Sequence, residues 1–182
     1  MDVDVAIRTR RSHKLFNGMP VGAAVLTELV ELATWAPNHK RTEPWRFSVL
    51  TTDRVPALAA CIEVALADGT IPAAKSAKLR HIVSGLGAVV AVRWVRTPAD
   101  PERDREDYAA VCCAVQNLML AAHARGIASY WTTSGAFIGA HLREFWQAAD
   151  GEEFAGAVLL GGAAIEMPAV RARSVADVTR WV

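Results

Sequence analysis

The amino-acid sequence predicts a single α+β domain over residues 1–182. Its length lies within the usual span of one domain and is sufficient to bury a hydrophobic core without disulfides or a structural metal. Apolar residues recur at helical spacing in some segments and alternate at strand spacing in others. The two kinds of segment are intermixed along the chain, with no internal repeat and no low-complexity segment between them.

The periodicity assigns each element to a stretch of sequence. Helices are expected over 3–10, 26–33 with Pro37 beyond it, 53–67 with Asp53 as N-cap, 73–84, 108–122 with Gly126 beyond its end, and 138–149. Strands are expected over 45–50, 88–95, 127–132 and 154–160. The helix over 108–122 has the clearest apolar stripe and is expected in the core. The strongly charged segment 97–107 is expected to be a solvated loop.

Charge and hydropathy limit the classes of partner. The net charge of +1 provides no broad positive field for nucleic acid, so such a partner is not expected. The apolar runs are too short to cross a bilayer, and the N-terminus has no signal-peptide pattern, so we expect a cytoplasmic protein without a membrane span. Hydrophobic residues make up 52% of the chain, which leaves apolar surface for a partner subunit.

The cysteines and tryptophans have simple structural interpretations. The three cysteines form no C-x-x-C pair and are expected to be buried, reduced thiols rather than disulfide or metal ligands. No metal site is predicted, because no histidine has a second ligand at metal-site spacing. Four tryptophans are expected in the core or at an interface rather than as stacking platforms. They are Trp45, Trp94, Trp131 and Trp146.

Two basic segments contain the residue types of a binding site. Residues 10–14 read Arg-Arg-Ser-His-Lys after the first helix, and guanidinium groups with a hydroxyl can bind a phosphate. Residues 36–47 form a polar loop between prolines, with an amide at Asn38 and an imidazole at His39. Taken alone, the first segment is more simply interpreted as a solvated basic helix end, and His39 as an ordinary surface or hydrogen-bonding histidine.

These segments, with four later ones, resemble the ordered landmarks of the nitroreductase family of flavoproteins. The six are RRSHKLF from residue 10, APNHKRTEPWRF from residue 36, QNLMLAA from residue 116, WTTSGAF from residue 131, LGG from residue 160 and RAR from residue 171. The resemblance spans nearly the whole chain. It implies a mixed, mostly antiparallel sheet flanked by helices, and an interlocked homodimer with FMN at the subunit interface.

The resemblance assigns the phosphate and ribityl end of FMN to basic and hydroxyl side chains. Arg10 and Ser12 match the residues that bind this end, and Arg11 assists them. Arg173, with Arg171, matches a late basic position that closes on the phosphate. Residues from both ends of the chain are therefore expected at one phosphate.

The flavin ring is assigned to the remaining landmarks. Lys14 matches a cation at the N1 and O2 edge, where it would stabilise the reduced anion and raise the reduction potential. Asn38 and His39 would reach the flavin of the other subunit. The residues implied to line the other side of the ring are Trp131, Thr132, Thr133 and Ser134. Trp35 departs from the family pattern, since short members have an arginine there.

The activity implied is that of an FMN-dependent oxidoreductase. NADH or NADPH would reduce the flavin in a ping-pong reaction, and a nitroaromatic or quinone-type small molecule would accept the electrons. No catalytic side chain is expected, because the flavin would carry the chemistry, and in agreement no serine lies in a G-x-S-x-G context. Three alternatives stay open: another redox task such as reductive dehalogenation, a flavin-binding or storage protein without turnover, and a dimeric scaffold without cofactor.

Overall fold

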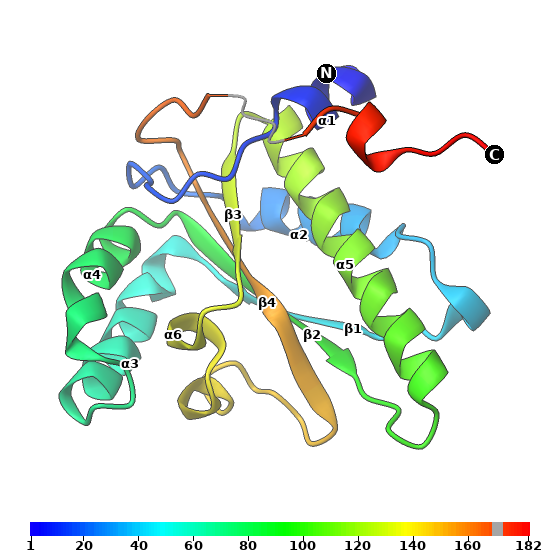
Figure 1. Ribbon diagram of the computed structural model, residues 1–182. Coiled ribbons are helices and arrows are strands. Elements are labelled where there is room, and N and C mark those ends of the chain that lie inside the picture. Colours follow the sequence, from blue (N-terminus) through cyan, green and yellow to red (C-terminus); the bar gives the residue numbers. More distant parts are fainter. Residues whose placement is uncertain (169–172) are drawn as a thin grey trace.

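The computed structural model describes residues 1–168 and 173–182, and a four-stranded antiparallel sheet forms its centre. The strands are β1 (Trp45–Leu50), β2 (Ala88–Val95), β3 (Ala128–Thr132) and β4 (Glu152–Gly161). They lie in the order β1-β2-β4-β3, so β3 is an edge strand (Figure 1). The register pairs Val90 with Val49 on one side and with Val158 on the other. All four strands coincide closely with the segments predicted from sequence.

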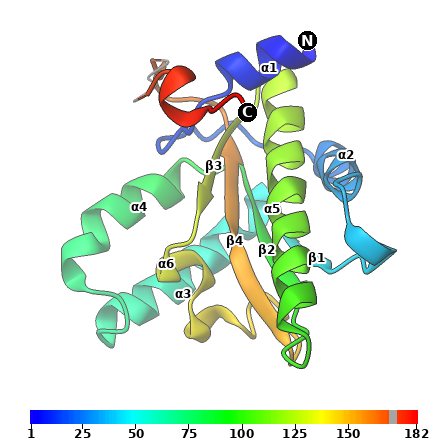
Figure 2. The same cartoon turned by 45° about the vertical axis from the view of Figure 1, so that its right-hand side comes forward.

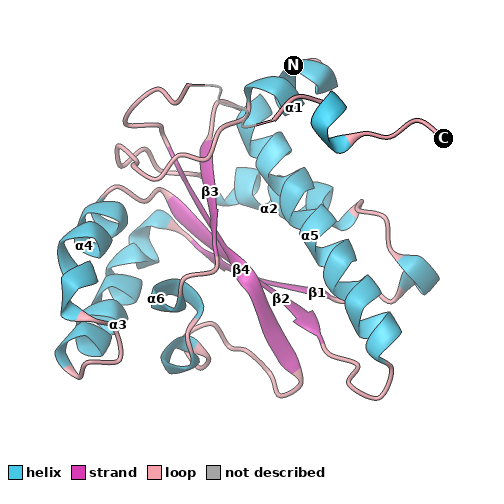
Figure 3. Cartoon of the chain, viewed as in Figure 1, coloured by secondary structure: helices cyan, strands magenta, loops and turns pink. Residues whose placement is uncertain are grey.

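Helices cover both faces of this sheet (Figures 2 and 3). The helices are α1 (Val3–Thr9), α2 (Ala23–Thr34), α3 (Val55–Ala67), α4 (Ser76–Ser84), α5 (Pro101–Ala124) and α6 (Gly135–Ile138). Short 3-10 helices span η1 (His39–Arg41), η2 (Thr52–Arg54), η3 (Ala73–Lys75), η4 (Ala140–Leu142) and η5 (Ala176–Val178). Within the described residues, no helix is long and apolar enough to span a membrane.

Two hydrophobic cores lie on the two faces of the sheet and meet at β2. Val89 and Ala91 pack into the core beneath α3, α4 and α6, whereas Val90 and Val92 pack into the core beneath α2 and α5. All four side chains have no exposed surface. An apolar run without polar alternation is therefore the sequence pattern of a strand that is covered on both faces.

The charged segment 97–107 is mostly helix, which corrects the prediction of a solvated loop. Helix α5 begins at Pro101, and the Asp100 side chain accepts a hydrogen bond from the Arg103 N–H at 3.1 Å. Proline at the first helical position, an aspartate cap and acidic residues in the first turn all favour a helix start. The Asp104 carboxylate also binds Arg96 at 2.8 Å, which ties this turn to the end of β2.

The segment 138–149 is not one helix, so this prediction was wrong. Helix α6 ends at Ile138, η4 follows, and Gln147 has a left-handed φ of 52°. The apolar spacing that suggested a helix reflects packing of a compact turn instead. The buried Trp146 indole anchors that turn by donating a hydrogen bond to the Phe137 carbonyl at 2.7 Å.

Three smaller expectations also need correction. Asp53 does not cap a helix, because it lies inside η2 and α3 begins only at Val55. All three cysteines are free, as expected, but none is fully buried, and Cys113 is exposed. Of the four tryptophans expected in the core or at an interface, Trp45 and Trp146 are buried, and the other two are partly covered.

A buried ion pair joins β2 to the start of β4. The Arg93 side chain donates to the Glu152 carboxylate at 2.7 Å, and the two side chains are 5% and 10% exposed. Arg93 also donates to Ser48 Oγ at 2.9 Å and to the Trp146 carbonyl at 3.2 Å. Charges this deep are tolerated because nearly every donor has an acceptor.

We expect the substitution Glu152→Gln to lower the free energy of unfolding by roughly 3 kcal/mol, because it leaves the Arg93 charge buried without a counter-ion. Urea denaturation followed by tryptophan fluorescence measures this loss. The control is Glu63→Gln, which breaks the exposed pair between Arg80 and Glu63 and should not shift the midpoint measurably. Equal stability of the two variants would show that the buried charge needs no counter-ion.

Candidate functional site

The first predicted segment leaves α1 and lies on the exposed edge of β3. Ser12 forms a parallel bridge with Ser129, and the His13 N–H donates to the Ser129 carbonyl at 3.0 Å. Further on, Phe16 bridges to Ala163 just beyond β4. The backbone from 12 to 16 is therefore fixed at two points, and the side chains between them have defined positions.

Glycines allow this segment to lie directly on the sheet. A Cβ atom at Gly85 would overlap the Phe16 carbonyl, and one at Gly87 would overlap the Met19 carbonyl. Backbone is thus packed on backbone just before β2 begins, which no other residue type permits without movement.

Four basic side chains meet where α1 contacts the last turns of α5. His123 Nε2 lies 2.8 Å from Thr9 Oγ1, and burial together with Arg10, His13 and Arg11 lowers the pKa of His123. Burial and then the charge of Arg11 likewise lower the pKa of Arg10. We call Arg10, Arg11, His13 and His123 the basic cluster.

The basic cluster contains buried polar atoms without partners. Within the described residues, Arg10 Nη1, Arg11 Nε, His13 Nδ1 and the neighbouring Ser129 Oγ are buried and make no hydrogen bond. Arg11 Nη1, by contrast, donates to the Arg8 and Arg10 carbonyls at 2.7 and 2.8 Å. No carboxylate in the described residues forms a salt bridge with Arg10 or Arg11. Unpaired buried cations are costly, so this arrangement suits a multivalent anion such as a phosphate.

A groove lies along β3, beginning at Tyr130, the residue after the Ser129 that pairs with Ser12. Its volume is about 590 Å³, and it lies at the sheet edge. The lining residues are Lys75, Tyr108, Tyr130, Trp131, Thr132, Thr133 and Ser134. From Ser129 to Thr132 the strand advances by about 10 Å at roughly 3.3 Å per residue. We call this hollow the β3 groove.

The residues of the predicted run 131–134 all line the groove, and three of their side chains also bond to backbone groups. The Thr132 hydroxyl accepts from the Ser134 N–H at 3.2 Å, and Ser134 Oγ caps α6. The Trp131 indole donates to the Ala155 carbonyl at 3.2 Å and lies where a Cβ of Gly156 would be. Thr133 is exposed in the groove.

Lys14 links the basic cluster to the β3 groove. Its ammonium lies 5.7 Å from the centre of the Tyr130 ring, within cation–π range, and Tyr130 lines the groove. A second cation, Lys75, enters the groove from η3. The groove therefore combines aromatic side chains with Lys75 in its lining and with Lys14 over its Tyr130 ring, which suits an elongated ligand with a planar body.

The second predicted segment lies elsewhere in the chain. Asn38 Oδ1 accepts from the Glu43 N–H at 2.7 Å, and the Thr42 hydroxyl donates to Asp107 in the first half of α5. Asp107 and His123 are about 24 Å apart along α5, at about 1.5 Å per residue. One chain therefore does not bring Asn38 and the exposed His39 to the basic cluster.

The late basic positions are only partly described. Arg171 lies outside the described residues. Arg173 is exposed and begins a C-terminal segment that lies beside α1 (Figures 1 and 2). Trp35, the departure from the family pattern, is 78% exposed at the end of α2.

Five residues near the site were not predicted: Ser129, His123, Lys75, Tyr108 and Tyr130. Each lies outside a recognisable motif, since Ser129 is one polar residue in an apolar strand and His123 looks like an ordinary cation at a helix end. Only their contacts reveal them. A serine within a predicted, mostly apolar strand is the one signal that was available.

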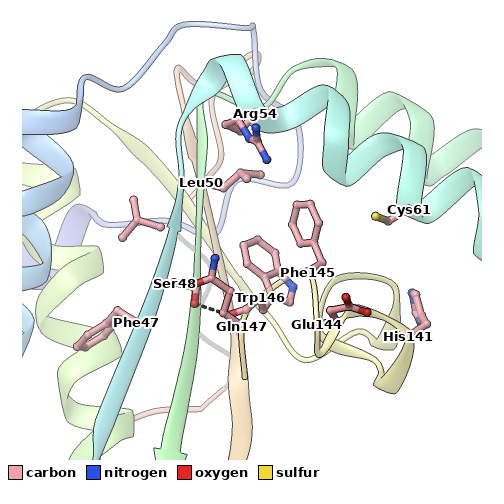
Figure 4. A pocket seen from close by; sticks show the side chains of 11 residues that line it. Phe47, Ser48, Leu50, Arg54, Cys61, His141, Glu144, Phe145, Trp146 and Gln147 are labelled. Atoms are coloured by element: carbon pink, nitrogen blue, oxygen red, sulfur yellow. Dashed lines mark hydrogen bonds between the residues drawn. The ribbon is translucent and has the colours of Figure 1, made fainter. Parts of the chain in front are cut away.

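A larger hollow of about 780 Å³ lies on the other side of the molecule, between β1, α3 and the turn after η4 (Figure 4). Ser48, Cys61 and Glu144 line it, and the Ser48 hydroxyl donates to the Trp146 carbonyl at 2.6 Å. None of the predicted site residues lines this hollow. Among the described residues, no group of histidine, cysteine, aspartate and glutamate could hold a metal ion.

Comparison with known proteins identifies the family. The Nitroreductase family model matches residues 7–162. A Bacillus subtilis relative named "Putative NAD(P)H nitroreductase YfhC" is 33% identical over 170 residues, covering 92% of this chain and 87% of the relative. The crystal structure of a nitroreductase-like family protein from Bacillus cereus has a TM-score of 0.83 and 26% identity, covering 100% of this chain and 96% of that chain.

A second solved structure, from Desulfovibrio desulfuricans, is described as a nitroreductase in complex with FMN. It has a TM-score of 0.74 and 26% identity, and the match covers 98% of this chain and 95% of that chain. These similarities confirm the predicted nitroreductase-like α+β fold. The chain belongs to the nitroreductase family.

Proposed function

We propose that this chain is an FMN-dependent NAD(P)H oxidoreductase that reduces nitroaromatic or quinone-type acceptors. The observation that supports it best is the pair of unpartnered, buried guanidinium nitrogens of Arg10 and Arg11 at one end of the β3 groove. An anion-binding site next to an aromatic groove matches a ligand with a phosphate and a planar ring.

The residues present fit FMN. Arg10, Arg11 and Ser12 would hold the phosphate and ribityl end, because Arg10 Nη1 and Arg11 Nε are buried without acceptors and Ser12 follows them on the segment that is bridged to β3. Trp131 and Thr133 would border the ring, and Thr132 and Ser134 would fix the turn that presents them. Lys14 and Lys75 would place positive charge beside the ring.

Bound FMN would supply the two-electron chemistry that joins oxidation of NADH or NADPH to reduction of the acceptor. The chain itself contributes binding, orientation and electrostatics. Lysine charge near the ring favours a ligand that gains negative charge on reduction, and the phosphate contacts hold the ligand at a fixed depth. No side chain is required as nucleophile or proton donor.

The site is proposed to be completed by a second copy of the chain. Asn38 and His39 belong to the η1 loop, which the Thr42 to Asp107 hydrogen bond holds about 24 Å along α5 from His123, so we infer that they contact a ligand at the basic cluster from another subunit. Apolar side chains are also exposed at Trp35 and Trp181, at 78% and 95%. Large exposed hydrophobic residues are characteristic of surfaces that a partner covers. We therefore propose a homodimer with FMN at its interface.

A complementation experiment tests the shared site. Arg10→Ala and His39→Ala should each weaken FMN binding as pure variants. In a dimer of one Arg10→Ala chain and one His39→Ala chain, one of the two FMN sites has both residues intact. Random mixing makes about half of the dimers of this kind, so about one quarter of all sites should recover full affinity. Sedimentation of the wild type should give the mass of two 19.6 kDa chains. No recovery on mixing, or a mass of one chain, would contradict the interface site.

The phosphate assignment has its own test. Arg10→Ala removes charge-assisted hydrogen bonds worth about 1.5 to 3 kcal/mol, so the Kd for FMN should rise by about 10-fold to 100-fold. Equilibrium titration followed by flavin fluorescence measures it. Arg54→Ala is the matched control, because Arg54 lines the hollow on the other side of the molecule and its loss should leave the Kd unchanged. If Arg10→Ala and Arg54→Ala changed the Kd for FMN by similar factors, Arg10 would not bind the phosphate.

Turnover distinguishes an enzyme from a flavin store. Under anaerobic conditions, NADPH or NADH should bleach the absorbance of bound FMN. Menadione or a nitroaromatic compound, added afterwards, should restore it. Stopped-flow absorbance records both half-reactions separately. A bound flavin that stays yellow with either nucleotide would instead identify a binding protein without turnover.

A further inference from the structure

We propose that His123 takes up a proton when a phosphate monoester dianion binds at the basic cluster, so that FMN binding is coupled to protonation. This inference rests on the proposed function and adds a residue to its phosphate site. It concerns the fourth member of the cluster, which has no counterpart among the landmarks of the sequence.

The hydrogen bonds of Thr9 determine which nitrogen of His123 is protonated. The Thr9 hydroxyl donates to the Val5 carbonyl at 2.6 Å, and a hydroxyl has one hydrogen to donate. The 2.8 Å contact between Thr9 Oγ1 and His123 Nε2 therefore has the imidazole as donor. The neutral ring carries its hydrogen on Nε2, and the lone pair of Nδ1 is available for a second proton.

The groups around His123 oppose that second proton in the ligand-free protein. Burial is the largest effect, followed by Arg10 on α1 and by His13 and Arg11 on the segment that follows it, and together they lower the pKa of His123. On its own helix, Arg125 is paired with Glu28 at 3.0 Å. The imidazole is therefore mainly neutral near neutral pH.

Other charged side chains near this end of the molecule do not cancel the positive charge of the basic cluster. In the C-terminal segment beside α1, the Asp177 carboxylate accepts from the Ser174 N–H at 2.8 Å, and Arg173 adds a further cation. At the opposite end of α1, Asp2 caps the helix. No carboxylate among the described residues contributes to the pKa of His123.

A bound phosphate reverses this balance. Its charge of about −1.5 to −2 at neutral pH offsets the arginines and attracts a proton to Nδ1. The pKa of His123 is then higher in the bound state than in the free state, so the complex holds more protons than its parts. Affinity should rise as the pH falls from about 8 toward 7, by at most about tenfold per pH unit for one proton.

Calorimetry measures this proton directly. Protein freed of flavin is titrated with FMN near pH 7 in two buffers that differ in ionisation enthalpy, and the difference in heat gives the protons taken up. We expect uptake of a fraction of a proton per FMN. Riboflavin, which has the ring but no phosphate, should bind without uptake. A phosphate monoester with a second pKa of about 6 can only release protons when it binds as a dianion, so uptake comes from the protein.

The variant His123→Gln isolates the residue, because its amide can still donate to Thr9 while it cannot be protonated. It should bind FMN and lose most of the uptake, whereas His13→Gln should retain most of it. Uptake that persists in His123→Gln, or FMN binding without uptake in the wild type, would overturn this inference alone. Failure of the wild type to bind FMN would overturn the proposed function as well.

Discussion

Direct packing of the backbone at residues 12–19 against the sheet is the constraint on which the rest of the site depends. The bridge from Ser12 to Ser129 and the bridge from Phe16 to Ala163 fix this segment at both ends of its course. Gly85 and Gly87 make the close approach possible. The segment covers the edge of β3 and gives the side chains around Ser12 defined positions.

Arg93 differs from Arg10 and Arg11 in whether its charge is balanced within the chain. Arg93 is buried with a carboxylate, a hydroxyl and a carbonyl as acceptors, and its charge stabilises the junction of β2 and β4. Arg10 and Arg11 have buried nitrogens without acceptors, next to two imidazoles. The first arrangement is complete within the chain and serves the fold. The second is incomplete and is explained by a ligand that brings the negative charge.

Helix α5 connects the separate parts of the proposed site. Its last turns contact α1 through His123, its first turns hold the η1 loop through Asp107, and Tyr108 lines the β3 groove. The η1 loop has left-handed conformations at Lys40, with φ of 57°, and at Glu43, with φ of 45°. Such strain persists only where surrounding contacts enforce it, and the Thr42 to Asp107 hydrogen bond is one of these contacts.

The sequence by itself determined the strands, most of the helices and the order of the landmark segments. These features are local, because apolar spacing and helix-capping residues act over a few neighbouring positions. The start of α5 at Pro101 was also present in the sequence, but the charge of that segment obscured its capping pattern. The break at Gly139 was not evident, because the buried Trp146 continues a helical spacing through tertiary packing.

Only the tertiary structure decided which of the predicted residues meet. Ser12 and Ser129 are adjacent because β3 is an edge strand, and Thr9 reaches His123 because α1 packs on the last turns of α5. The same packing places Asn38 at the other end of that helix. Contacts between segments about a hundred residues apart depend on how whole elements pack. The spacing of residues along the chain does not predict this packing.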